Sequence, residues 1–226
     1  MTMIASNLQA VHGRIDAACR AAGRKPGQVR LLAVSKTFDV PQLELALAAG
    51  QLCFGENYIQ EAVEKIQALR DRAIEWHCIG PIQSNKTRLV AAHFDWVQSV
   101  DRIKIAQRLS EQRPAGMAPL QVCIQVNSDG GPTKGGVSPD DLPALVDAVR
   151  QLPRLHLRGL MTIPEPVGDF AAAVALHARA RALFDALNAR GLQLDTLSMG
   201  MSADLDAAIH AGSTMLRIGS AIFGQR

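Results

Sequence analysis

Val29-Arg-Leu-Leu-Ala-Val-Ser-Lys36 decides the fold, because it is an apolar run that ends abruptly in a serine and a lysine. A strand of this composition is buried on both faces, which is typical of the parallel sheets of α/β proteins. Lys36 follows the last apolar residue by two positions, so we expect its side chain to lie at the rim of that sheet.

The same strand pattern recurs along the whole chain. Short apolar runs predict eight strands, at Val29–Ser35, Gln51–Phe54, Glu75–Ile79, Asp95–Val100, Leu120–Val126, Leu157–Thr162, Thr196–Met199 and Met215–Ile218. Helical spacing of apolar residues predicts a first helix and then a helix in each connection, at Ile4–Ala22, after Pro41, and at Tyr58–Arg70, Asn85–His93, Arg102–Glu111, Pro139–Gln151, Asp169–Arg190 and Ala203–Ala211.

Eight strands that alternate with helices predict an α/β protein with a single (β/α)₈ TIM-type barrel. The helix at Ile4–Ala22 would precede the first strand. A length of 226 residues suits one barrel domain over residues 1–226. An open, doubly wound sheet is the alternative architecture.

Composition limits the classes of function. Hydrophobic content of 48% and charged content of 20% are ordinary for a soluble globular protein. The net charge is +3, and the Lys and Arg residues are scattered along the chain rather than clustered. Only two Trp and one Tyr are present, so both the charge pattern and the aromatic content argue against nucleic-acid binding. No secretory signal or membrane-spanning run is visible, so we expect a cytoplasmic protein without a membrane partner.

The cysteines are widely separated, and their spacing predicts neither a C-x-x-C motif nor a metal site. They are expected to be small buried residues in a reducing compartment, three of them inside strands. These residues are Cys19, Cys53, Cys78 and Cys123.

Polar residues and glycines follow nearly every predicted strand. The active sites of barrel enzymes lie at the carboxyl ends of the strands, so this asymmetry predicts one functional face. The segments concerned include Ser35-Lys36, Gly55-Glu56-Asn57, Gly80–Asn85, Asn127-Ser128-Asp129, Gly200-Met201-Ser202 and Gly219-Ser220.

Lys36 is a candidate covalent anchor for a carbonyl cofactor. A lysine forms a Schiff base with an aldehyde only as the neutral amine, and a position at the end of a buried strand favours that form. The alternative is a structural lysine at the rim, paired with a carboxylate such as Glu56.

The loops after the last two strands predict a phosphate site, as is usual in barrels of this kind. Ser202 offers a hydroxyl, Gly219 permits close approach of the backbone, and Ser220 offers a backbone N–H. Ser202 could instead be the N-cap of the helix at Ala203–Ala211. Arg217 lies in an apolar strand, where it would face a ligand or form a salt bridge with Asp204 or Glu56.

The loop Asn127–Gly136 is the longest glycine-rich connection. It is a candidate mobile cover over the mouth of the barrel. A flexible turn that carries one solvated lysine, Lys134, is an equal alternative.

Several blocks, in order and at consistent spacing, carry a resemblance to a known family. They are Leu31-Leu-Ala-Val-Ser-Lys-Thr37, Phe54-Gly-Glu-Asn-Tyr-Ile-Gln-Glu61, Trp76-His-Cys-Ile-Gly-Pro-Ile-Gln-Ser-Asn-Lys86, Arg158-Gly-Leu-Met-Thr162, Ser198-Met-Gly-Met-Ser-Ala-Asp204 and Arg217-Ile-Gly-Ser-Ala-Ile-Phe-Gly224. With these blocks the chain resembles the pyridoxal-phosphate homeostasis proteins, whose single domain is similar to the N-terminal barrel of alanine racemase.

The resemblance implies that pyridoxal 5′-phosphate is bound to Lys36 as an aldimine. It also implies that Ser202, with the backbone of Gly219 and Ser220, holds the phosphate. Arg217 would lie beside the pyridine nitrogen, and Asn57 would lie near the cofactor.

Racemisation on this cofactor needs a base on each face of the α-carbon. In alanine racemase the second base is a tyrosine from another domain, and the single tyrosine here, Tyr58, is a poor substitute. We therefore expect a monomeric protein that holds the cofactor and passes it to apo-enzymes. The alternatives are an amino-acid racemase or lyase with Lys36 as one base, and a barrel that binds another phosphorylated metabolite without a covalent link.

Overall fold

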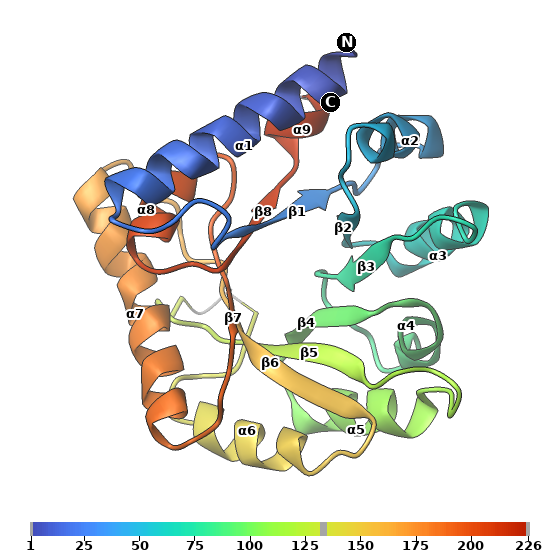
Figure 1. The fold of residues 1–226 in the computed structure, drawn as a ribbon. Helices are drawn as coiled ribbons and strands as arrows, with labels where there is room; N and C mark the ends of the chain where they lie inside the picture. The colour runs from blue at the N-terminus through green and yellow to red at the C-terminus, as the bar shows by residue number, and fades with distance from the viewer. Residues whose placement is uncertain (1, 132–134, 225–226) are drawn as a thin grey trace.

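A computed structural model of the chain describes residues 2–131 and 135–224, which form a closed barrel of eight parallel strands in sequence order. Figure 1 shows the helices arranged around the outside of this barrel. The strands are β1 (Arg30–Val34), β2 (Cys53–Glu56), β3 (Glu75–Cys78), β4 (Trp96–Val100), β5 (Leu120–Gln125), β6 (Leu155–Met161), β7 (Thr196–Ser198) and β8 (Met215–Ile218). The predicted barrel is confirmed, and the open sheet is excluded.

The helices follow the predicted order. They are α1 (Met3–Ala21), α2 (Val40–Ala48), α3 (Ile59–Ala68), α4 (Thr87–His93), α5 (Ile103–Gln112), α6 (Leu142–Arg150), α7 (Phe170–Ala189), α8 (Leu205–His210) and α9 (Ser220–Phe223). Within the described ranges, no helix combines the length and apolar composition that crossing a membrane would require.

Strand β1 shows how the barrel separates two cores. Leu31 and Ala33 belong to the large apolar cluster between the barrel and its helices. Leu32 and Val34 belong to a smaller cluster with Ile79 and Met215, inside the barrel. Because side chains alternate between the two faces of a strand, Lys36 continues the inward series.

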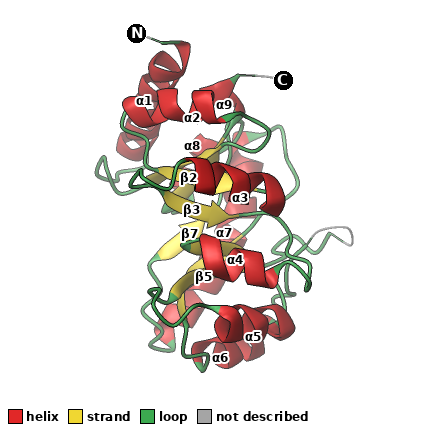
Figure 2. Ribbon diagram, turned by 90° about the vertical axis from the view of Figure 1, so that its right-hand side faces the viewer, coloured by secondary structure: helices red, strands yellow, loops and turns green. Residues whose placement is uncertain are grey.

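Helix α1 packs along the outside of the barrel, beside α8 and α9 (Figure 1). Its buried face repeats at helical spacing and includes Ile4, Leu8, Val11 and Ile15. The Asn7 side chain donates a 2.9 Å hydrogen bond to the carbonyl of Ile222 in α9. In Figure 2, turned by 90° from Figure 1, α1 and α9 again lie at the same end of the molecule. The N-terminal helix therefore fixes the segment that follows the last strand.

Strand β2 differs from the prediction, because it begins two residues later and extends to Glu56. Glu56 pairs in register with Cys78 of β3, and its side chain is buried. The sequence placed Glu56 in a loop because a carboxylate is rare inside a strand. Helix α9 was not predicted, since it is only four residues long.

Gly159 in β6 packs directly against the backbone of β7. A Cβ atom there would lie 1.7 Å from the carbonyl oxygen of Thr196 in β7. No side chain can occupy this space unless the two strands separate.

We predict that Gly159→Ala lowers the free energy of unfolding by about 1–3 kcal/mol, the usual cost of forcing extra atoms into a packed interior. Gly168→Ala is the matched control, since a Cβ there meets nothing within 4 Å. Urea unfolding followed by circular dichroism measures both. Equal unfolding midpoints for the two variants would contradict the prediction.

Candidate functional site

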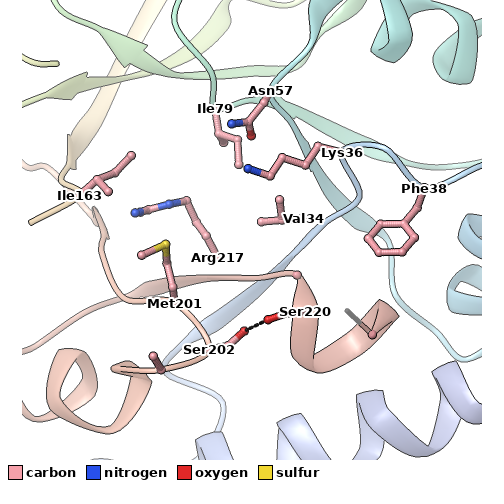
Figure 3. Close-up of a pocket in the computed structure, with 13 residues that line it drawn as sticks. Val34, Lys36, Phe38, Asn57, Ile79, Ile163, Met201, Ser202, Arg217 and Ser220 are labelled. Carbon is pink, nitrogen blue, oxygen red and sulfur yellow. Dashed lines mark hydrogen bonds between the residues drawn. The ribbon is translucent and has the colours of Figure 1, made fainter. Parts of the chain in front are cut away.

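A cavity of about 720 Å³ lies at the carboxyl ends of the strands, where the sequence predicted the functional face. All the predicted site residues line it, and Figure 3 labels all of them except Gly219. These residues are Lys36, Asn57, Ser202, Arg217, Gly219 and Ser220. The other walls are mostly apolar and include Val34, Phe38, Ile79, Ile163 and Met201.

Lys36 extends into this cavity from the end of β1, and Asn57 lies beside it (Figure 3). The predicted alternative was an ion pair between Lys36 and Glu56, but the hydrogen-bond partners of Glu56 are other residues. The Glu56 carboxylate accepts hydrogen bonds from the Ser35 hydroxyl at 2.6 Å and from Lys65 Nζ at 2.8 Å. It therefore faces helix α3 on the outside of the barrel.

Asn57 presents a buried side-chain oxygen that has no hydrogen-bond partner among the described residues. An unpaired buried acceptor is costly unless a ligand or water supplies a donor. Its place in the cavity wall fits a polar ligand.

Ser202 and Ser220 bring two hydroxyl groups together on the wall opposite Asn57 (Figure 3). The Ser220 hydroxyl donates to the Ser202 hydroxyl at 3.3 Å. At Gly219 a Cβ would lie 3.1 Å from the carbonyl oxygen of Val34, so the backbone there approaches β1 without room for a larger side chain. This combination of hydroxyls and close backbone fits an anion such as a phosphate.

The alternative role of Ser202 as a helix cap is wrong. Helix α8 begins at Leu205, and its N-cap is Asp204. The Asp204 carboxylate accepts the backbone N–H of Met201 at 2.7 Å and the Nε2–H of His177 at 2.9 Å. Burial opposes ionisation of Asp204, but these hydrogen bonds outweigh it and lower the pKa of the carboxyl group.

The loop that carries Ser202 is therefore held from two outer helices. His177 reaches it from α7, and Arg14 from α1 donates to the Ser202 carbonyl at 2.9 Å. Sequence reasoning missed both residues because they lie far away in the chain. The one available signal was a histidine on the buried face of an alanine-rich helix.

Arg217 is buried, and its guanidinium donates to the Ser198 hydroxyl at 2.8 Å and to the Thr162 carbonyl at 2.9 Å. Among the described residues, neither Asp204 nor Glu56 hydrogen-bonds to it, so the predicted salt bridge is not formed. Burial lowers the pKa of Arg217 to about 10, which still leaves the group protonated at neutral pH.

A chain of hydrogen bonds continues from Arg217 through the barrel interior. The Ser198 hydroxyl donates to Gln98 Oε1 at 2.6 Å, and Gln98 Nε2 donates to His77 Nδ1 at 2.9 Å. His77 Nε2 then lies 2.6 Å from Glu75. Because Nδ1 accepts, the ring is neutral and Nε2 carries the proton, which agrees with the lowered pKa that burial gives His77.

The tyrosine and cysteines do not offer a second base at this cavity. Tyr58 is 53% exposed and does not line it. Burial raises the pKa of Cys78 and of Cys123 to about 12. Cys53 was expected to be buried, but it is half-buried at the other end of the barrel, next to Arg30.

The glycine-rich loop is tied to the segment that follows β6. The Asp129 carboxylate accepts the backbone N–H of Glu165 at 2.7 Å, and the Ser128 hydroxyl lies 2.8 Å from that of Thr162. None of the described residues of this loop lines the cavity. Lys134 lies outside the described residues, so both predictions for this loop, a cover and a flexible turn with a solvated lysine, stay predictions.

The lowered pKa of Glu75 makes the free energy of unfolding depend on pH. Burial raises its pKa, but hydrogen bonds from His77 and from Arg30 outweigh burial and lower the pKa to about 2, against 4.5 in an unfolded chain. The stabilisation is therefore complete above about pH 4.5 and is lost as the pH falls towards 2.

Glu75→Gln keeps a hydrogen-bond acceptor but removes the charge, so we expect a shallower loss of stability in acid. Urea midpoints measured between pH 6 and pH 3 test this, with the exposed Glu64→Gln as control. Parallel pH profiles for the wild type and Glu75→Gln would contradict it.

Comparison with known proteins places the chain in a family. Residues 6–226 match the family of the alanine racemase N-terminal domain. The pyridoxal phosphate homeostasis protein of Pseudomonas aeruginosa is 59% identical over 226 residues, which cover 100% of this chain and 97% of that protein.

Solved structures agree. PipY of Synechococcus elongatus, solved with pyridoxal phosphate bound, is 36% identical to this chain. The match covers 98% of this chain and 100% of PipY, with a TM-score of 0.84. An alanine racemase of Clostridium difficile, 14% identical, shares the fold over 98% of this chain and 57% of its own, with a TM-score of 0.77. The chain therefore belongs to the alanine racemase N-terminal domain family and, within it, to the pyridoxal phosphate homeostasis proteins.

Proposed function

We propose that this protein binds pyridoxal 5′-phosphate reversibly at the cavity and serves to store and deliver it. One observation carries the proposal: an amine, two hydroxyls, a bare glycine backbone and a buried guanidinium converge on one cavity. The names of its relatives, and the cofactor present in the PipY structure, support the same ligand.

Lys36 is the residue we assign to the covalent link. The bound cofactor supplies an aldehyde carbon, to which the neutral lysine amine adds with loss of one water to form a C=N bond. Apolar side chains, among them Val34 and Ile79, form the cavity wall beside Lys36.

Ser202 and Ser220 would bind the phosphate through their hydroxyl groups. The backbone N–H of Ser220, next to Gly219, adds a donor that a larger side chain at position 219 would crowd. The loop of Ser202 is already fixed by Arg14 and Asp204, so little ordering is needed when the anion binds.

Arg217 would hydrogen-bond the pyridine nitrogen. Its guanidinium remains protonated at neutral pH, so it donates and leaves the nitrogen unprotonated. A pyridine ring without a proton withdraws electrons weakly, which disfavours removal of an α-proton from an amino acid.

Among the described residues, the cavity offers no second proton acceptor for turnover. Of the described residues that line it, Lys36 and Arg217 are the ones with ionisable side chains. Racemisation needs a base on each face of the α-carbon, so this lining fits storage and transfer to apo-enzymes rather than catalysis. The cytoplasm is the compartment that we propose for this role.

We predict that borohydride reduction of the cofactor-loaded protein attaches a pyridoxyl group to the peptide that contains Lys36. Lys36→Ala is expected to lose the visible absorption band of the Schiff base and to retain part of the affinity, because the phosphate contacts remain. Lys104→Ala, at an exposed position on α5, should behave as the wild type. A labelled peptide elsewhere, or none, would refute the assignment.

We also predict that the loaded protein does not exchange the α-protons of amino acids at enzymatic rates. The experiment incubates each amino acid with the protein in deuterated water and follows the α-proton by NMR. Because an unprotonated pyridine ring beside Arg217 withdraws electrons weakly, exchange should stay at the level of free cofactor. Fast exchange that Lys36→Ala abolishes would establish an enzyme instead.

A further inference from the structure

The backbone on either side of Lys36 is held by two charged side chains of α3. Lys65 Nζ donates to the Ser35 carbonyl at 2.8 Å, on the peptide group that precedes Lys36. Glu61 accepts the backbone N–H of Thr37 at 2.6 Å, on the peptide group that follows Lys36. Both peptide groups of the anchor lysine therefore end on one helix.

Further contacts join these charges into one unit. Lys65 Nζ also lies 2.8 Å from the Glu56 carboxylate and 2.6 Å from that of Glu61. Glu56 in turn accepts the Ser35 hydroxyl at 2.6 Å. Lys65 and Glu56 are 5% and 1% exposed, so neither can exchange its partners for water at low cost.

The backbone conformation of Thr37 shows why the contacts from Glu61 and Lys65 are needed. Its φ of 65° lies in the left-handed region, which a β-branched residue rarely adopts. If the Thr37 N–H lost its partner, this residue could relax towards an ordinary conformation and turn Lys36 with it.

We infer that Glu61 and Lys65 are positioning residues for Lys36, which orient its amine for the covalent link. The inference rests on the proposed function. A purely structural role, in which the ion pair only docks α3 on the barrel, would affect every ligand of the cavity alike. A positioning role affects only ligands that bond to Lys36.

Two probes separate these roles. Pyridoxal 5′-phosphate reaches both the phosphate site and the amine of Lys36. Pyridoxine 5′-phosphate carries an alcohol in place of the aldehyde, so it reports the phosphate and pyridine contacts alone.

Glu61→Ala should weaken the binding of pyridoxal 5′-phosphate and slow its Schiff-base absorption change by about tenfold, as expected for the loss of a hydrogen bond to a charged group. The affinity for pyridoxine 5′-phosphate should remain within about twofold of the wild type, since the phosphate contacts are intact. Glu61→Gln keeps an acceptor for the Thr37 N–H and should recover most of the loss. Glu64→Ala, on the exposed side of the same helix, is the matched control.

Equal weakening of both probes by Glu61→Ala, or no effect on either, would overturn the inference. Should Glu61→Ala not fold, Glu61→Asp, which keeps the charge but draws it back from Thr37, gives the same comparison. A wild-type protein that forms no Schiff base would refute the proposed function itself. Normal Schiff-base formation in both the wild type and Glu61→Ala would refute only the positioning role of Glu61 and Lys65.

Discussion

The pairing of β8 with β1 closes the barrel, and the candidate site depends on it. Arg217 in β8 pairs in register with Leu32 in β1, so residues nearly at opposite ends of the chain become neighbours. Only this closure brings Lys36 next to Ser202, Gly219 and Ser220. Parallel strands put all their carboxyl ends on one side, which is why those side chains share one cavity.

Closure also limits what can lie inside the barrel, because alternate residues of every strand point inward. Instead of branched aliphatic side chains alone, this interior holds a chain of polar groups that links Arg217 to Glu75 through Ser198, Gln98 and His77. Each member both receives and gives a hydrogen bond, apart from the ends, and the neutral form of His77 keeps the pattern consistent. Removing one partner would leave a buried polar group unpaired, which would lower the free energy of unfolding by about 1–3 kcal/mol.

The sequence predicted the barrel and the cavity for one physical reason. Strand runs and the polar residues after them are local patterns, and the fold converts them into a common edge without further information. The position of Lys36 could be predicted because it needs only the alternation of β1 and the end of its apolar run.

Contacts between distant residues could not be predicted in this way. The buried Glu56 carboxylate is paired with Lys65 of α3, a contact that no local pattern shows, and the residue was assigned to a loop. Arg14 and His177 reach the Ser202 loop from separate helices, and no local pattern connects them. Ser202 was one candidate for the helix cap, but the helix begins only at Leu205, and the residue type alone does not show where it starts. The types of residue after each strand were therefore enough to predict where the site lies, whereas the orientation of its side chains depends on tertiary contacts.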